Sequence, residues 1–418
     1  MPSKKIIIVG GGISGCVSAY YLSCRGHKVE IYEKSGNIGG IMRDHVFDGE
    51  IFFSAPHYLK PDIFWTKDVI KQKNNKNLLK KINFSYGSYT NLFKEIFFSK
   101  NFAHPVTRKK FLGLKKNENV KEILLLQDRF NHYQKTISTA LIKWCKNFTD
   151  QFDILHSNCR DILAVGKILF SNDQKKIFSL KKNNKLEDDL LGIPNLKDRK
   201  IKAYVPIRGY NFFFEKLLIF LKKKKVSIKL NSHVQIKKDN KKILLINNGK
   251  ELKADYFIWA SNPVPLFKTL KDNNIDNPFT RAFLAFFKVK DNPNKVKDIY
   301  IQVFSNKTLI TRVYIYNIHG ITKVTVEGIY SKKKNQLSNI VKYTNEILKQ
   351  IDPKIKLSKE MNIKKIVKHN LLTVSDYNSF LNFKDDSKKN GIISGAWHIN
   401  TREKKIDKII DNLKKLNL

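Results

Sequence analysis

The chain has 418 residues, 42% of them hydrophobic and 11% aromatic, so it is long enough for two or more lobes and too apolar for a disordered protein. Its formal net charge of +42, from 79 Lys and Arg against 37 Asp and Glu, is spread along the whole sequence. We interpret most of this charge as solvated surface. No motif that reads bases occurs, so we predict no nucleic-acid partner, while attraction of an anionic substrate or of anionic lipid stays open.

The four cysteines form no CxxC pair and no cluster with zinc-site spacing, which predicts reduced thiols and no metal site. No signal peptide is visible, and no uncharged apolar run reaches the ~18 residues of a transmembrane helix. We therefore expect a cytoplasmic protein without a transmembrane segment. The run 217–225 (LLIFLKKKK) is typical of a helix end, with peripheral membrane contact as the alternative.

Residues 4–34 show βαβ organisation. The stretch KKIIIVG at 4–10 predicts a short buried strand that ends in glycines. Residues 14–25 predict a helix closed by Gly26, and residues 28–34 alternate as a second strand. This order favours an α/β fold.

The rest of the chain predicts a second lobe of mixed helices and strands, whose segments alternate along the chain with further segments of the α/β part. Residues 35–62 are loop, 63–150 are helical or mixed, and 160–200 are polar and irregular. A helix and strand at 205–238 precede a hairpin with its turn at Asn248–Gly249. The remaining predicted elements are a buried strand within 254–261, strands within 281–330, a helix at 336–351, a buried strand at 391–397 and a terminal helix at 402–416.

The motif Gly10-x-Gly12-x-x-Gly15 follows the first strand. Gly10 permits a tight turn, Gly12 lets the backbone approach a pyrophosphate, and Gly15 allows the helix to pack closely on the strand. The helix N-terminus, at Ile13 and Ser14, can then hold phosphate through free N–H groups. The pattern predicts a dinucleotide site.

An acidic residue follows at the expected place. Glu33, with Lys34 next to it, ends the second predicted strand 18 residues after Gly15. A carboxylate there can accept hydrogen bonds from a ribose diol. The alternative is an ordinary glycine turn with a surface glutamate.

A second glycine pair, Gly39-Gly40, is followed by Arg43. With this pair, residues 6–40 resemble the FAD fingerprint of the amine-oxidase-like flavoprotein superfamily, which includes protoporphyrinogen oxidase, phytoene desaturases and UDP-galactopyranose mutases. The resemblance implies FAD as the cofactor, with Arg43 near its phosphates or its isoalloxazine. It also implies a Rossmann-like FAD-binding domain (GR2 type) with an inserted mixed α+β substrate domain.

Two later segments resemble the same superfamily. Val234 and the strand ending at Ala260 resemble the second part that contacts FAD, with Val234 beside the adenine. The stretch GIISGAW resembles the one whose backbone meets the flavin, which places Gly395 and Trp397 in the site. Ala396 stands where the superfamily usually has Asp, and a plain buried strand before a helix is the alternative.

The resemblance divides the chain into five parts. Residues 1–62, 201–265 and 386–418 are expected to form the FAD-binding domain. Residues 63–200 would be an inserted substrate or helical lobe, and 266–385 would supply the strands and helix of the substrate domain.

Two features resemble the mutase branch. Ala55-Pro56-His57, after the glycine pair, resembles the mutase loop beside the flavin, and Arg312 in LITRVYIYN resembles the arginine that holds the substrate diphosphate. A guanidinium suits paired phosphate oxygens. The resemblance implies His57 and Arg312 as catalytic residues, with a structural histidine and a surface arginine as the alternatives.

The implied function is a FAD-dependent sugar-nucleotide mutase that interconverts pyranose and furanose through reduced flavin N5, in surface polysaccharide biosynthesis. The alternative is a FAD-dependent oxidoreductase of the amine-oxidase, protoporphyrinogen-oxidase or desaturase kind, acting on a small or hydrophobic substrate. The C-terminal G-R-x-G stretch of the mutases and their paired tyrosines are missing, since the chain has GAWHINTREKK there. A non-enzymatic flavoprotein and an oligomer also stay open.

Overall fold

The structure of the chain is a computed structural model. It describes residues 2–55, 57–61, 63–72, 77–90, 97–98, 175, 179, 182, 201–239, 242–271, 279–290, 296, 298–304, 308, 310–329, 339–353, 355–358, 360–370, 387–388, 391–395 and 402–418. None of the helices in this part of the chain combines the length and the apolarity needed to cross a membrane.

Five parallel strands form the first sheet, in the order β19-β12-β1-β2-β8. They come from three separate stretches of chain: β1 (Lys5–Val9) and β2 (Lys28–Tyr32), then β8 (Ser227–Lys229) and β12 (Tyr256–Trp259), and last β19 (Ile392–Ser394). β1 is apolar after its first residue because both faces of the sheet are covered. The predicted α/β fold is confirmed.

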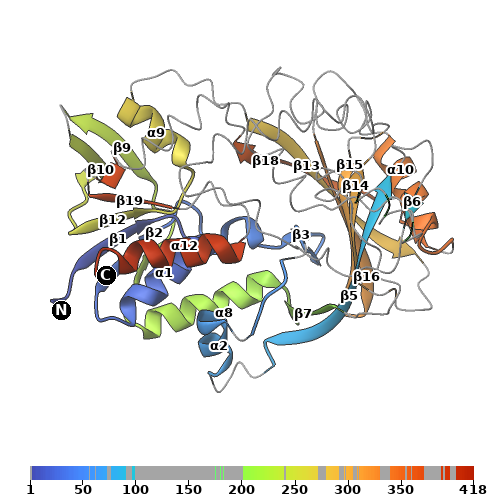
Figure 1. Cartoon of the computed structure of the whole chain (residues 1–418), viewed down its shortest axis with the longest axis horizontal. Coiled ribbons are helices and arrows are strands. Elements are labelled where there is room, and N and C mark those ends of the chain that lie inside the picture. The colour runs from blue at the N-terminus through green and yellow to red at the C-terminus, as the bar shows by residue number, and fades with distance from the viewer. Residues whose placement is uncertain are drawn as a thin grey trace.

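Helices cover one face of this sheet, and a small sheet with one helix covers the other (Figure 1). Ile6 and Ile8 of β1 share a core with α1 (Ile13–Ser23), α8 (Tyr210–Lys223) and α12 (Arg402–Lys414). Val9, which alternation turns to the opposite face, packs instead with Leu245 and Leu266. These belong to the layer of β9 (Val234–Asp239), β10 (Lys242–Asn247), β11 (Lys250–Glu251) and α9 (Pro263–Lys271).

Local signals in the sequence locate the elements to within a few residues. α1 ends at Ser23, and Gly26 has the left-handed φ of 82° that its predicted capping role needs. Asn248 and Gly249 have φ of 48° and 75°, as expected for the tight turn between β10 and β11.

Nine strands form the second sheet, in the order β17-β13-β16-β15-β14-β5-β6, with β18 paired to β13 and β7 paired to β5. The strands are β5 (Leu79–Thr90), β6 (Phe97–Phe98), β7 (Ile201–Pro206), β13 (Phe279–Lys290), β14 (Asp298–Phe304), β15 (Ile310–Ile318), β16 (Ile321–Ile329), β17 (Lys356–Leu357) and β18 (Asn362–Asn370). Four shorter elements lie between β2 and β5 in the sequence. They are the 3-10 helix η1 (Gly40–Met42), β3 (His45–Phe47), β4 (Glu50–Phe52) and α2 (Phe64–Ile70).

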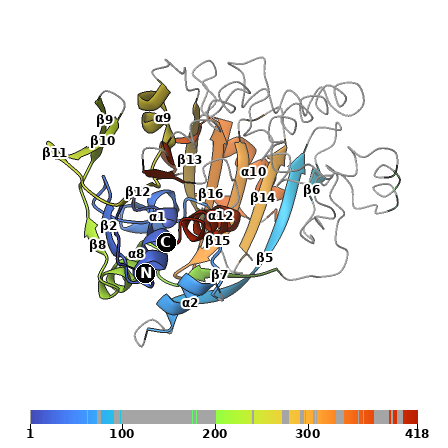
Figure 2. The same cartoon turned by 60° about the vertical axis from the view of Figure 1, so that its left-hand side comes forward.

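The two faces of the second sheet have different neighbours. Val313 and Ile315 of β15 pack in a core with α10 (Ile340–Lys349), whereas Tyr314 and Tyr316 belong to the core that contains α8. The sheet therefore presents one face to the first sheet and its helices (Figure 2). Any ligand held between the two parts would meet this face.

The second sheet takes strands from both sides of residue 200. β5, from the segment predicted as an inserted lobe, pairs in parallel with β14, and β7, which follows residue 200, pairs with β5. α8 begins four residues after β7 ends, so the chain passes from one part to the other between residues 206 and 210. The domain boundaries given above stay a prediction.

Candidate functional site

The glycine loop lies at the carboxyl end of β1 and leads directly into α1. Gly10 has φ of 108°, and its N–H donates to the Tyr32 carbonyl at 2.8 Å. A Cβ at Gly10 would lie 2.9 Å from the Ser261 nitrogen, and a Cβ at Gly15 would collide with the Gly10 carbonyl oxygen. The packing of the protein itself therefore requires glycine at both positions.

Gly12 is different, because among the described residues no atom beyond its chain neighbours and its own helix backbone lies within 4 Å of the place its Cβ would take. Gly12 is the N-cap of α1, with φ of −67°, and it provides no side chain for the first N–H groups of the helix. Ile13 and Ser14 open the first turn. An open position at an uncapped helix N-terminus fits a diphosphate, which accepts hydrogen bonds and is stabilised by the helix dipole.

Glu33 lies beside this loop and is 9% exposed. Its Oε2 accepts from the Gly11 N–H at 2.6 Å, and its Oε1 accepts from the N–H and the hydroxyl of Ser35 at 2.9 and 2.8 Å. The carboxylate keeps lone pairs beyond these bonds, so it can still accept from a ribose hydroxyl. The adjoining Lys34 is exposed.

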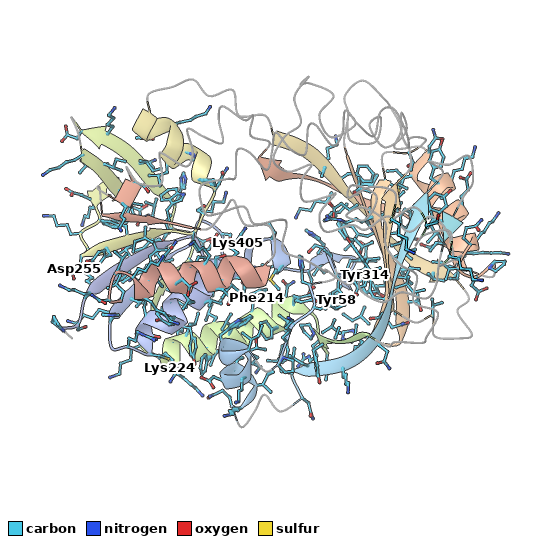
Figure 3. All side chains as sticks on the ribbon, in the orientation of Figure 1. Tyr58, Phe214, Lys224, Asp255, Tyr314 and Lys405 are labelled. Atoms are coloured by element: carbon cyan, nitrogen blue, oxygen red, sulfur yellow. The ribbon has the colours of Figure 1, made fainter. Side chains whose placement is uncertain are left out.

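The second glycine pair packs against the first loop. The Gly39 N–H donates to the Gly11 carbonyl at 2.8 Å, and Gly12 and Gly39 form an isolated parallel bridge. Gly39 and Gly40 have φ of 116° and 57°. A Cβ at Gly39 would lie 2.5 Å from the ring of Phe214 on α8 (Figure 3). The structure thus brings both predicted glycine motifs to the N-terminus of α1.

Arg43 follows η1 and is tied to the start of α8. Its Nε donates to the Asn211 Oδ1 at 2.9 Å, and the Asn211 N–H donates to Asp44 at 2.9 Å. Burial raises the pKa of Asp44 to about 7, against the opposing effect of hydrogen bonds from Asn211 and Tyr210 and of the Arg43 charge. Sequence reasoning missed Asp44 and Asn211, because no pattern links Arg43 to a helix 168 residues later.

The later predicted cofactor residues lie around the carboxyl ends of adjacent strands. Val234 is 5% exposed and packs with Val9 and Trp259. The Gly395 N–H, just after β19, donates to the Trp259 carbonyl at 3.0 Å. Ligands of open α/β sheets bind at this edge. Trp397 lies outside the described residues, as does the neighbouring position 396.

His57 lies in a loop that α8 holds in place. Its N–H donates to the Ala55 carbonyl at 2.8 Å, and its carbonyl accepts from the Tyr210 hydroxyl at 2.7 Å. The two rings meet edge-on, with 5.9 Å between their centroids. Pro56 lies outside the described residues.

Arg312 lies on the face of β15 that carries Tyr314 and Tyr316, because side chains two residues apart point the same way. Its Nη1 is 3.4 Å from the Glu327 Oε2 on β16, and its side chain is 30% exposed. Arg312 also hydrogen-bonds Tyr300 on β14. The ion pair offsets much of the positive charge that a diphosphate would meet here.

Two buried tyrosines of β15 and the half-buried Tyr58 pack together next to His57. The rings of Tyr58 and Tyr314 meet edge-on at 6.3 Å, and Tyr314 stacks on Tyr316 at 4.6 Å between centroids (Figure 3). Burial raises the pKa values of Tyr58 and Tyr314 well above the ordinary value, so both phenols stay protonated at neutral pH.

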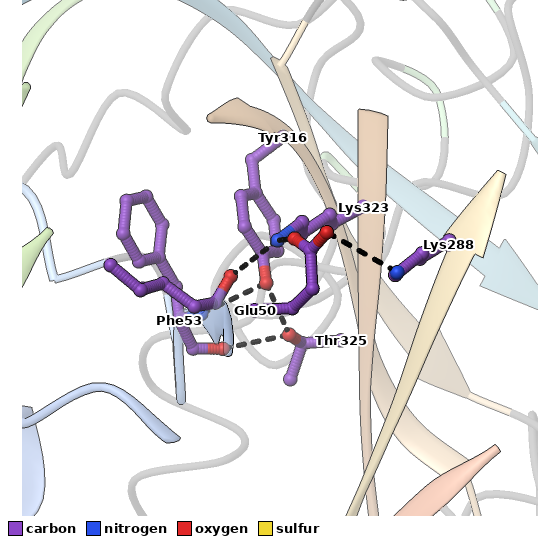
Figure 4. Close-up of polar contacts among 7 residues, drawn as sticks. Glu50, Phe53, Lys288, Tyr316, Lys323 and Thr325 are labelled. Carbon is purple, nitrogen blue, oxygen red and sulfur yellow. Dashed lines mark hydrogen bonds and ion pairs between the residues drawn. The ribbon is translucent and has the colours of Figure 1, made fainter. Parts of the chain in front are cut away.

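An ion-pair network joins β4 to the second sheet (Figure 4). Lys323, which is 2% exposed, donates through Nζ to the Glu50 Oε2 at 2.5 Å and to the Ile51 carbonyl at 2.8 Å. Lys288 lies 3.3 Å from the other Glu50 oxygen. The single carboxylate of Glu50 therefore offsets one of these two positive charges, whereas Arg312 has a carboxylate of its own.

A neutral network lies next to it. The Phe53 N–H donates to the Tyr316 hydroxyl at 2.8 Å, and the Thr325 hydroxyl donates to the Phe53 carbonyl at 2.7 Å (Figure 4). Both networks fix the strand that leads to His57. Among the described residues, no group of three His, Cys, Asp or Glu is placed to hold a metal ion.

The N-terminal part of the chain, which holds both glycine loops, is similar in sequence to known proteins. A family model described as an NAD(P)-binding Rossmann-like domain matches residues 8–72. The 4,4'-diapophytoene desaturase (4,4'-diaponeurosporene-forming) of Staphylococcus aureus strain COL is 38% identical over 66 residues, which are 16% of this chain and 13% of that protein. The chain thus matches a small part of the length of this curated relative.

Solved structures match over nearly the whole chain. Reduced UDP-galactopyranose mutase matches with a TM-score of 0.66 and 14% identity, over 99% of this chain and 96% of the other. The chain therefore shares its overall fold with this mutase. A fatty acid isomerase from P. acnes and a putrescine oxidase match with TM-scores of 0.54 and 0.53 at 13% identity, each over 99% of both chains.

This shared fold agrees with the resemblance stated from the sequence and confirms the predicted Rossmann-like architecture. The predicted FAD cofactor and flavoenzyme activity agree with it. At identities of 13–14%, these structural matches establish the fold alone, so the reaction has to be inferred from the residues of the site.

Proposed function

We propose that the chain is a FAD-dependent enzyme whose cofactor lies across the two glycine motifs. The observation that carries this proposal is the bridge between Gly12 and Gly39, next to the open position at Gly12 and the buried carboxylate of Glu33. Together they offer a phosphate site and a ribose acceptor at the ligand-binding edge of a parallel sheet. Val234, Gly395 and Arg43 would complete the cofactor contacts.

The proposed reaction is the interconversion of pyranose and furanose forms of a nucleotide sugar. The whole-chain similarity to UDP-galactopyranose mutase supports it, as does the place of Arg312 on the sheet face that meets α8. Bound FAD in its reduced form would supply the nucleophile for this chemistry.

The protein's own residues would bind and orient the substrate. Arg312 would accept the diphosphate by exchanging its contact with Glu327 for phosphate oxygens, which suit a planar guanidinium. Tyr58 and Tyr314, as neutral phenols, could donate hydrogen bonds and exclude water next to His57. The spread positive charge would favour an anionic substrate.

A screen of UDP-, dTDP- and GDP-sugars with dithionite-reduced protein tests this reaction. We expect interconversion by the reduced protein and none by the oxidised protein, with products separated by chromatography. Glu327→Gln should bind UDP more tightly than wild type, and Arg312→Ala more weakly. A flavin-loaded, reduced protein that converts none of these sugars would refute the mutase assignment.

The second candidate is a FAD-dependent oxidoreductase. The carboxylates of Glu327 and Glu50 support it, because they offset two of the three positive charges of Arg312, Lys323 and Lys288 on an aromatic face, which suits a less polar substrate. The match to a stretch of diapophytoene desaturase also supports it. Anaerobic addition of the correct substrate would then bleach the flavin, which a mutase substrate would not do.

A cytoplasmic location and a place in polysaccharide biosynthesis belong to the mutase proposal. Cell fractionation tests the first. Loss of furanose sugars from surface glycans, on deletion of the gene, tests the second.

A further inference from the structure

The start of α8 forms a support for the segment that carries the second glycine pair. α8 has glycine at its N-cap, Gly209, with φ of 87° and no capping side chain of its own. The Asp44 carboxylate takes the capping role, because it accepts from the Asn211 N–H at 2.9 Å and from the Tyr210 N–H. A Cβ at position 209 would collide with this carboxylate, so glycine is needed there.

Three further contacts fix the same segment. One turn into α8, the ring of Phe214 packs beneath Gly39. The Ser54 hydroxyl contacts the carbonyls of Ile41 and Arg43, at 3.1 and 3.0 Å. The side-chain oxygen of Asn211 then accepts from the Arg43 Nε at 2.9 Å. Segment 39–44 is therefore held from the start of α8 at several points.

The bond to Arg43 differs from the others because it restrains a side chain. A half-buried arginine has several rotatable bonds, and fixing its Nε limits them. The two terminal nitrogens of the guanidinium are not needed for this bond and can bind an anion. Arg43 lies three residues after Gly40. A Cβ added at Gly40 would lie 3.3 Å from the Gly12 Cα, so this segment runs close to the phosphate loop.

We propose that Asn211 is a positioning residue, which orients the Arg43 guanidinium toward the phosphates of the bound dinucleotide. This role rests on the proposed function, because it needs FAD at the glycine motifs. Asp44 supports it by fixing the backbone of Asn211. Removal of the Asn211 oxygen should leave Arg43 charged but free to turn, which would cost cofactor affinity.

The test is a double-mutant cycle on FAD affinity, measured by titrating flavin-free protein. Asn211→Leu removes the acceptor, and we expect roughly 10-fold weaker binding, as for loss of one hydrogen bond to a charged group. Asn211→Asp keeps an oxygen in place and should restore most of the affinity. Arg43→Leu should weaken binding at least as much, and adding Asn211→Leu to it should have no further effect.

A purely structural role would give a different pattern. Asn211→Leu would then lower the melting temperature of the flavin-free protein and weaken binding equally with and without Arg43. Glu215→Leu, on the exposed side of α8, is the matched control and should bind FAD as wild type does. Should Asn211→Leu not fold, Asn211→Ser, which moves the acceptor away from Arg43, takes its place in the cycle.

The outcomes separate this role from the proposed function. A wild-type protein that takes up no FAD overturns both. A wild type that binds FAD, with an Asn211→Leu variant of equal affinity or with additive effects in the double variant, overturns the positioning role alone.

Discussion

Gly12→Ala should weaken FAD binding without destabilising the fold, whereas Gly39→Ala should destabilise the fold. Gly12 has an extended backbone that any residue adopts, and its Cβ position is open among the residues that the structure describes. Gly12→Ala should therefore fold without strain. It should even gain about 0.4–1 kcal/mol, because alanine restricts the unfolded chain.

Gly39→Ala should destabilise the fold. The left-handed φ of 116° costs a non-glycine residue about 1–3 kcal/mol. Its Cβ would lie 2.5 Å from the ring of Phe214, which is 2% exposed and has no space to move, so overpacking adds about 1–3 kcal/mol. The sum of about 2–6 kcal/mol is a large part of the ~5–15 kcal/mol that stabilises a typical protein.

The assay measures both properties on flavin-free protein. Denaturant unfolding should show Gly12→Ala at or above wild-type stability and Gly39→Ala well below it. FAD titration should show roughly 10- to 100-fold weaker binding by Gly12→Ala, because its methyl group displaces the diphosphate from one or two N–H donors. Equal FAD affinity of Gly12→Ala and wild type would refute the phosphate site, and wild-type stability of Gly39→Ala would refute the packing argument.

Three further predictions concern buried charges. Asp44 is 7% exposed, and burial raises its pKa from 3.8 to about 7, so the folded protein holds this proton more tightly than the unfolded chain does. The free energy of unfolding should thus fall as pH rises from about 4 to about 7, by at most about 4 kcal/mol from this group, and Asp44→Asn should remove that part of the pH profile in denaturant titrations. Lys323→Met should destabilise the protein by about 2–4 kcal/mol, because it leaves the Glu50 carboxylate with Lys288 alone and the Ile51 carbonyl without its donor. Lys323→Met with Glu50→Gln should recover part of the loss, and additive effects would contradict a direct ion pair. Glu33→Gln should weaken FAD binding roughly 10-fold, and should weaken binding of riboflavin, which lacks the adenosine ribose, no more than a surface substitution does.

The sequence alone was sufficient for the nucleotide-binding part of the fold. β1, the glycine loop, α1 and β2 lie within about 30 residues, and their pattern depends on local backbone geometry and on burial of a short parallel unit. The same holds for the turn at Asn248–Gly249, where both residues need left-handed backbone. Such features are local, so residue types and spacing determine them.

The tertiary structure decided which side chains from different segments meet. The partners of Arg43 and Glu50 lie 168 and 273 residues away, and no spacing in the sequence predicts them. Arg312 is a candidate because its segment resembles one of the mutases, but its pairing with Glu327 depends on the register of β15 against β16. A slip of one residue would turn Arg312 to the opposite face, since side chains alternate along a strand. Sheet order and register arise from packing of the whole chain, and they determine whether this arginine meets a carboxylate, a tyrosine or solvent.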